Sequence, residues 1–182
     1  MNMQHIYNQS QFGENWFNYQ FLYQRMVGES DSGSIFVEVG SWKGKSTAFM
    51  CVEIANSEKL IDFHCVDTWN GSPEHVRDGH NLKELYDTFT TNMQSLKNYY
   101  TPHRMTSVEG SNLFKNESLD FVFIDACHEY ECVIEDIKHW LPKVKPGGVL
   151  AGHDADWPGV KRAVEECLGN VNVEETSWIY RK

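Results

Sequence analysis

Short apolar runs alternate with segments whose apolar residues recur at helical spacing along most of this chain. The runs predict strands at residues 35–39, 60–66, 103–108, 119–124 and 149–152. They are rich in β-branched and aromatic residues and carry few charges, which is typical of parallel strands buried on both faces of a sheet. Each run ends in polar or glycine residues, where a connection to the next element is expected.

The segments between these runs have the spacing of amphipathic helices. Apolar residues three and four apart predict helices over about residues 14–26, 45–55, 81–97, 130–141 and 160–168. Two short apolar segments at 171–173 and 178–180 predict a terminal hairpin. Strands that alternate with helices predict an α/β fold, a three-layer doubly wound Rossmann-like sheet that is mostly parallel with a C-terminal antiparallel hairpin strand.

The length of 182 residues fits one α/β domain with a substantial core. We expect residues 1–33 to form an N-terminal helical extension and residues 34–182 to form the domain proper. Residues 68–80 contain two glycines and a proline among mixed charges. That composition predicts a surface loop that acts as a lid.

Charge and cysteine usage narrow the classes of partner. A net charge of −10 and a pI near 5.2 argue against a nucleic-acid partner, because phosphate binding requires clustered Lys and Arg. No apolar stretch approaches the roughly 20 residues that cross a bilayer, and the N-terminus lacks a signal-peptide pattern. Five cysteines without CxxC spacing are typical of reduced thiols. We therefore expect a cytoplasmic protein with a small-molecule substrate and no nucleic-acid or membrane partner, and homo-oligomerisation stays open.

A glycine-rich turn at residues 38–46 joins the first strand to its helix. Its two glycines are separated by three residues, one fewer than a phosphate-binding P-loop requires, and the GxGxxG dinucleotide pattern is missing. The carboxylate of Glu38 repels a phosphate but suits a ligand with an ammonium and a carboxylate, such as S-adenosylmethionine. Asp67 ends the second strand, where an acid accepts hydrogen bonds from ribose hydroxyls.

On these residues the chain resembles the class I S-adenosylmethionine-dependent methyltransferases, whose first motif is an acid, then Gly-x-x-x-Gly, then an acid ending the next strand. The resemblance implies that Glu38, Gly40 and Gly44 hold the methionine part of the cofactor and Asp67 its ribose. It also implies that the segment at residues 109–111 lies beside the adenine. The full set of cofactor-binding candidates is Glu38, Gly40, Ser41, Gly44, Ser46, Asp67, Gly110, Ser111 and Asp125. The residues alone leave open that the glycines only permit a tight turn.

Acidic and imidazole side chains end two neighbouring strands of the expected sheet. Asp125 follows the run at residues 119–124, and His153 and Asp154 follow the run at 149–152. Two carboxylates and an imidazole that converge would repel or desolvate one another unless a cation lay between them, so a divalent metal is expected at Asp125, His153 and Asp154. His128 lies three residues beyond Asp125, and an ordinary histidine pKa near ~6.5 suits a general base.

These residues resemble the metal-dependent O-methyltransferases, and more closely the methyltransferase-24 group, through their Ile-Asp-x-x-His-x-Tyr and Gly-Gly-x-x-x-Gly-His-Asp elements. The resemblance covers about residues 35–168. It implies that Asp125 and the pair His153 and Asp154 bind Mg²⁺, and that His128 takes a proton from a substrate hydroxyl. His153 departs from the pattern, because many of the metal enzymes have an acid there. Either His153 lies outside the ligand set, or the metal is softer, such as Mn²⁺, Fe²⁺ or Zn²⁺.

We therefore expect metal-assisted methyl transfer from S-adenosylmethionine to a hydroxyl of a small molecule, with a sugar or polyol preferred. Two other classes stay open. A metal-dependent hydrolase would use Asp125, His128, His153 and Asp154 and would need no cofactor. A non-catalytic protein would bind the cofactor and act through an interface that uses its aromatic N-terminal helix.

Overall fold

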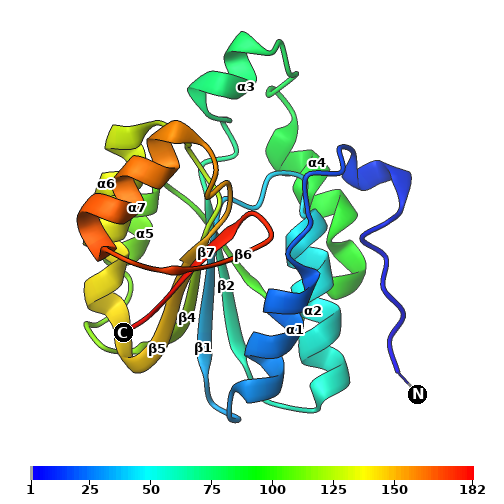
Figure 1. Cartoon of the computed structure of the whole chain (residues 1–182). Coiled ribbons are helices and arrows are strands. Elements are labelled where there is room, and N and C mark those ends of the chain that lie inside the picture. The colour runs from blue at the N-terminus through cyan, green and yellow to red at the C-terminus, as the bar shows by residue number, and fades with distance from the viewer. Residues whose placement is uncertain (1) are drawn as a thin grey trace.

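Seven strands form one sheet in the order β3-β2-β1-β4-β5-β7-β6 in the computed structural model of the chain (Figure 1). The structure describes residues 2–182, apart from the side chains of Pro73 and Glu74. Strands β1 to β5 pair in parallel, whereas β7 is antiparallel to both β5 and β6. This topology confirms the predicted doubly wound sheet with a C-terminal antiparallel hairpin.

The elements follow the predicted alternation of strands and helices. The strands are β1 (Ile35–Val39), β2 (Asp62–Asp67), β3 (Thr101–Arg104), β4 (Leu119–Ile124), β5 (Val144–Gly152), β6 (Asn172–Glu174) and β7 (Ser177–Arg181). The α-helices are α1 (Gln20–Glu29), α2 (Lys45–Ser57), α3 (Pro73–Arg77), α4 (Leu85–Asn92), α5 (Ser107–Ser111), α6 (Tyr130–Trp140) and α7 (Pro158–Leu168). Three short 3-10 helices are η1 (Ser10–Phe12), η2 (Gln94–Leu96) and η3 (Leu141–Lys143). No helix in the described residues has both the length and the apolar character that a membrane span needs.

Helices cover both faces of the sheet (Figure 1). On one face, Phe36 of β1 and Phe121 of β4 belong to the apolar cluster that also contains residues of α1, α2 and α4. On the other face, Val37 and Val122 belong to the cluster that contains residues of α6 and α7. Successive strand residues point to opposite faces, so each apolar run fills both layers of the core.

The strand order reverses between β1 and β4, which lie side by side at the centre of the sheet. The chain leaves β1 at Gly40 and leaves β4 at Asp125, whose backbone N–H donates to Val39 O at 2.7 Å. Such a switch point opens a crevice beyond the carboxyl ends of the strands, where ligands bind in open α/β sheets. The candidate residues at the ends of β1, β4 and β5 therefore gather at one edge.

The N-terminal helix begins later than predicted. Residues 14–19, which we call the strap, were expected to be helical but form an irregular segment, and α1 starts at Gln20. Phe17 and Tyr19 are buried while Trp16 and Asn18 are exposed, so burial alternates from one residue to the next over residues 16–19. The aromatic residues of the strap thus pack as in an extended segment and not as a helical stripe.

The segment after β2 also differs from its prediction. The expected loop at residues 68–80 contains the short helix α3, and the helix expected over 81–97 is divided into α4 and η2. The strand expected at 103–108 ends at Arg104, because Thr106 and Glu109 form a reciprocal capping box that starts α5. A Thr-x-x-Glu pattern is a sequence signal for a helix start, and it overrides the apolar run here.

Candidate active site

Two cavities meet beyond the carboxyl ends of β1 and β4. The larger has a volume of about 510 Å³ and is lined by the strap, the glycine turn and residues that follow β4 and β5. The smaller, of about 320 Å³, is lined by the end of β2, the start of α5 and part of α6. Gly40, Trp42, His75 and Asp125 line both. An elongated ligand can therefore lie across Gly40 with one part in each cavity.

Gly40 allows the closest backbone approach in the site. Its φ is +90°, and a Cβ atom there would lie 1.9 Å from the carbonyl oxygen of Asp125. Gly44 precedes α2 with a φ of +91°, and a Cβ atom there would lie 3.0 Å from the side chain of Met93. Both positions therefore require glycine, since other residues rarely adopt this backbone conformation and have no space for a side chain.

Glu38 lies inside the protein, beneath the glycine turn. It is 1% exposed, and its carboxylate accepts hydrogen bonds from Tyr23 Oη at 2.9 Å, Ser41 Oγ at 2.8 Å and Thr47 Oγ1. Burial raises the pKa of Glu38, and these hydroxyls oppose the rise. We expected Glu38 to touch the cofactor directly. In the structure this carboxylate instead accepts hydrogen bonds from the glycine turn and from the start of α2.

Asp67 also holds the glycine turn in place. Its Oδ2 accepts hydrogen bonds from the backbone N–H groups of Ser41 at 2.8 Å and Trp42 at 3.0 Å, and its Oδ1 accepts one from Trp69 N at 2.7 Å. Burial raises the pKa of Asp67, while these amides act in the opposite direction. Asp67 lines the smaller cavity. Its contact with a ribose therefore stays a prediction, on a carboxylate that already holds the turn.

The remaining cofactor candidates divide into two groups. Ser41 and Ser46 line the larger cavity. Gly110 and Ser111 lie within α5, where a Cβ atom on Gly110 would meet Val66 and where Ser111 is fully buried. The smaller cavity is lined by the residues that precede them, at positions 106–108. The adenine contact expected at residues 109–111 is therefore better matched by the start of α5.

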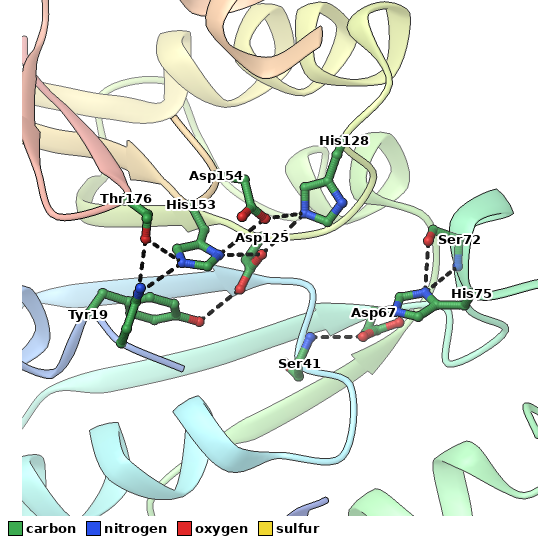
Figure 2. A network of polar contacts seen from close by, with 11 residues as sticks. Tyr19, Ser41, Asp67, Ser72, His75, Asp125, His128, His153, Asp154 and Thr176 are labelled. Atoms are coloured by element: carbon green, nitrogen blue, oxygen red, sulfur yellow. Dashed lines mark hydrogen bonds and ion pairs between the residues drawn. The ribbon is translucent and has the colours of Figure 1, made fainter. Parts of the chain in front are cut away.

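Asp125, His128, His153 and Asp154 come together as one cluster, which we call the carboxylate–imidazole cluster (Figure 2). His128 Nε2 lies 2.9 Å from Asp154 Oδ2 and 3.5 Å from Asp125 Oδ1. His153 Nδ1 lies 3.2 Å from Asp154 Oδ2 and 3.7 Å from Asp125 Oδ1. Both imidazoles thus face both carboxylates, as expected from neighbouring strand ends.

The charges in this cluster shift one another's pKa values. Burial alone would lower the pKa of His128 and His153, but contact with the two carboxylates outweighs it and raises both to about 10. Burial would raise the pKa of Asp125 and Asp154, but the imidazoles hold both below their usual range. When His128 faces these carboxylates alone, it therefore keeps its proton at neutral pH. The expected histidine pKa near ~6.5 does not apply there.

The cluster also has the composition of a metal site. Asp125, His128 and Asp154 each offer one ligand atom, and these atoms all lie within 4.8 Å of one another. Two carboxylate oxygens and an imidazole nitrogen suit a divalent cation such as Mg²⁺ or Mn²⁺. His153, expected as a ligand, is not in this group. Its Nε2 lies 2.9 Å from Asn18 Oδ1 and 2.8 Å from Thr176 Oγ1.

Several residues that line the site were not among the predicted catalytic, cofactor-binding or metal-binding residues. Tyr19 Oη donates to Asp125 Oδ2 at 2.9 Å, and the imidazole of His75 stacks on Trp42 with ring centroids 4.1 Å apart. Trp16 and Trp157 line the larger cavity and are 48% and 44% exposed. The alternating aromatic residues at 17 and 19 were a usable signal for a buried, extended strap. Nothing local indicates the contacts of His75.

The sequence of the chain matches a known protein family. Residues 37–155 match a family described as a methyltransferase domain. That match covers more than half of the chain and includes the glycine turn and the carboxylate–imidazole cluster, but not the strap. An uncharacterized protein, y4gI, from Sinorhizobium fredii is 29% identical over 120 residues. The match covers 66% of this chain and 13% of the relative, so the chain spans only a small part of that protein's length.

Solved structures share the fold at low sequence identity. An O-methyltransferase from Bacillus cereus in complex with SAH is 17% identical, with a TM-score of 0.57 over 88% of this chain and 76% of that chain. CalS11, a TDP-rhamnose 3'-O-methyltransferase, is 14% identical, with a TM-score of 0.61 over 89% and 76%. A protein from Corynebacterium glutamicum is 11% identical, with a TM-score of 0.66 over 95% and 85%. Since a single family pattern accounts for most of the sheet and for the site, the chain belongs to the methyltransferase-24 family of class I methyltransferase domains.

Proposed function

We propose that this chain transfers a methyl group from S-adenosylmethionine to a hydroxyl oxygen of a small molecule, with metal assistance. The observation that carries the proposal is the position of the carboxylate–imidazole cluster where the two cavities meet. Asp125 lines both cavities, while His128 and Asp154 line the larger one. A methyl donor that crosses Gly40 and an acceptor in the larger cavity would therefore meet beside these groups.

The groups that line the two cavities suit a cofactor with a nucleoside part and an amino-acid part. The smaller cavity has hydrogen-bonding groups at Asp67 and at residues 106–107, which suits a nucleoside. Ser41 and Ser46 face the larger cavity just beyond Gly40, where the methionine part would lie. The bound SAH of the Bacillus cereus relative supports this choice of cofactor.

Asp125 and Asp154 are the residues that would hold a divalent cation, with Mg²⁺ preferred. Such a cation would stabilise negative charge on a bound hydroxyl and so lower its pKa. Its positive charge would also offset the negative charge of Asp125 and Asp154, whose contact raises the pKa of His128. His128 Nε2 can then accept the proton of the acceptor hydroxyl.

The acceptor that suits the larger cavity is a sugar or a polyol. A volume of about 510 Å³ admits a small molecule and no folded partner. The half-exposed rings of Trp16 and Trp157 offer flat apolar faces to the C–H groups of a sugar ring, and Asn15 and Asp156 add polar groups. CalS11, which shares the fold, is described as acting on TDP-rhamnose and so supports this class.

His128→Ala tests the assignment of the base. We expect S-adenosylmethionine to bind with unchanged affinity and methyl transfer to a panel of sugars and polyols to fall by about 10²- to 10⁴-fold, since a general base contributes that much. Calorimetric titration and transfer of a labelled methyl group measure the two quantities. His139→Ala is the matched control, because His139 lies on α6, lines neither cavity and has its Nδ1 2.8 Å from Glu135 O. Full turnover in His128→Ala would contradict the assignment.

A further inference from the structure

The strap lies outside the region that matches the family, yet it contacts the carboxylate–imidazole cluster. We propose that Tyr19 is a positioning residue that makes the cluster select Mg²⁺ or Mn²⁺ over Ca²⁺, because its hydroxyl occupies one oxygen of Asp125. This inference rests on the proposed cation site. It adds a specificity determinant that comes from the strap and not from the strand ends.

The two oxygens of Asp125 have different partners. Oδ2 accepts a hydrogen bond from Tyr19 Oη at 2.9 Å. Oδ1 faces the cluster, 3.5 Å from His128 Nε2 and 3.7 Å from His153 Nδ1 (Figure 2). A hydrogen bond to a charged carboxylate is among the stronger ones in proteins. Asp125 therefore turns Oδ1, and not Oδ2, toward a cation bound in the cluster.

Aromatic packing fixes the position of the Tyr19 hydroxyl. Tyr19 is 5% exposed, and its ring lies with its centroid 4.4 Å from Phe123 of β4 and 4.7 Å from Phe17 of the strap. A third ring, Tyr23, lies 5.1 Å away. Since the phenol ring cannot turn away without opening this core, the hydroxyl stays on Asp125 Oδ2.

The strap contacts the cluster at a second point. Asn18 Oδ1 accepts hydrogen bonds from His153 Nε2 at 2.9 Å and from Thr176 Oγ1 at 3.0 Å. Because an amide oxygen only accepts, the His153 proton at this contact is on Nε2. This arrangement turns His153 Nδ1 toward Asp154 and leaves His153 tied to the strap. Tyr19 and Asn18 thus hold two members of the cluster from one side.

The preference for one cation over another depends on how many carboxylate oxygens can bind it. Ca²⁺ takes six to eight oxygen ligands and often binds a carboxylate through both oxygens. Mg²⁺ requires an octahedral shell and is commonly held by one or two carboxylates together with water. With one lone pair of Oδ2 engaged by Tyr19, binding of a cation through both oxygens of Asp125 is disfavoured. The cluster therefore suits the smaller cations, and removal of the Tyr19 hydroxyl would relax that preference.

Tyr19→Phe tests this role, because it removes the hydroxyl and keeps the ring. The whole chain is titrated calorimetrically with MgCl₂ and with CaCl₂, and the ratio of the two affinities is the readout. We expect the ratio to shift toward Ca²⁺ by about tenfold, the effect of one lost charged hydrogen bond. Tyr23→Phe is the matched control. It removes an equally buried hydroxyl, 2.9 Å from the carboxylate of Glu38, and should leave the ratio unchanged.

The outcomes separate the two proposals. If the wild-type chain binds a cation that Asp154→Asn abolishes, and Tyr19→Phe leaves the ratio unchanged, the role of Tyr19 is wrong while the cation site stands. If Asp154→Asn does not affect cation uptake, the cation site fails and the inference fails with it. The wild-type chain gives a test that does not depend on the folding of any variant. Tighter binding of Ca²⁺ than of Mg²⁺ would overturn the inference.

Discussion

The backbone of Gly40 lies close to the carbonyl of Asp125 and so joins the glycine turn to the carboxylate–imidazole cluster. We expect Gly40→Ala to lower the free energy of unfolding by at least ~3 kcal/mol, because a methyl group there would meet the carbonyl of Asp125 at a φ of +90°. Gly33→Ala is the control, since its φ is +94° but nothing lies within 4 Å of the added methyl. That variant should lose only about 1–2 kcal/mol. Urea unfolding compares them, and equal losses would contradict the account.

The carboxylate–imidazole cluster gives stability a specific pH dependence in the presence of a chelator. The pKa of His128 and of His153 rises from 6.5 to about 10 on folding, so their contribution is complete below pH 6.5 and is lost as the pH rises through about 10. Asp125 and Asp154 have lowered pKa values, so their contribution exists above pH 3.8 and is lost as the pH falls through their folded values.

Asp154→Asn removes a partner of both imidazoles. The difference in the free energy of unfolding between the wild-type chain and this variant should therefore narrow from pH 7 to pH 10, because the histidines lose their protons over that range. Urea unfolding at a series of pH values in the presence of a chelator measures it. A difference that stays constant across this range would mean that the imidazoles are not held protonated by Asp154.

The location of a single residue in the site could be predicted where that residue directly follows a strand. Asp125, His153 and Asp154 directly follow β4 and β5, and the parallel pairing of these strands brings them together. The contact expected between Glu38 and the cofactor did not take account of the face of β1 on which its side chain lies. It lies two residues after Phe36 on β1, so its side chain points to the same face, into the layer of α1 and α2. The hydroxyl groups that donate hydrogen bonds to its carboxylate belong to elements whose packing the local sequence does not indicate.

At the scale of elements, α3 is the segment that closes over the glycine turn. Its contact with the turn is the stack of His75 on Trp42, with planes 13° apart. We expect His75→Ala to speed amide hydrogen exchange across residues 73–79 and to weaken the binding of S-adenosylmethionine, because both cavities lose a wall residue.

Arg77→Ala is the matched control on the same helix. Arg77 forms an exposed ion pair with Glu129, and such pairs contribute little to stability. It should change neither hydrogen exchange nor cofactor affinity. Exchange rates that are the same in His75→Ala and Arg77→Ala would show that the stack does not hold α3 in place.

Elements whose whole run is buried were predicted best. The bounds of β1 and β4 agree with the predicted runs, because these central strands are apolar on both faces. The prediction of a helix for the strap was wrong, because over so short a span its aromatic residues fit a helical stripe and an alternating pattern equally well. The predicted end of β3 was wrong, because Thr106 and Glu109 start a helix where the apolar run continued. In both cases packing or capping decided between two patterns that the sequence supported equally.

At the scale of the whole molecule, the alternation of strands and helices was enough to predict the topology and the edge that carries the site. The acceptor that we propose would contact the strap and Trp157, which lie outside the family match, and α3, which lies inside it. The strap reaches the larger cavity through a contact between residues more than 100 positions apart, that of Tyr19 with Asp125. Such contacts follow from the packed structure and not from any local pattern.

The central claim is that the crevice between β1 and β4 binds S-adenosylmethionine, and calorimetric titration of the whole chain with that cofactor tests it most directly. We predict saturable one-to-one binding that SAH competes away and that ATP does not, since the glycine turn is one residue shorter than a phosphate-binding loop. No heat of binding with S-adenosylmethionine, or ATP bound in its place, would contradict the account.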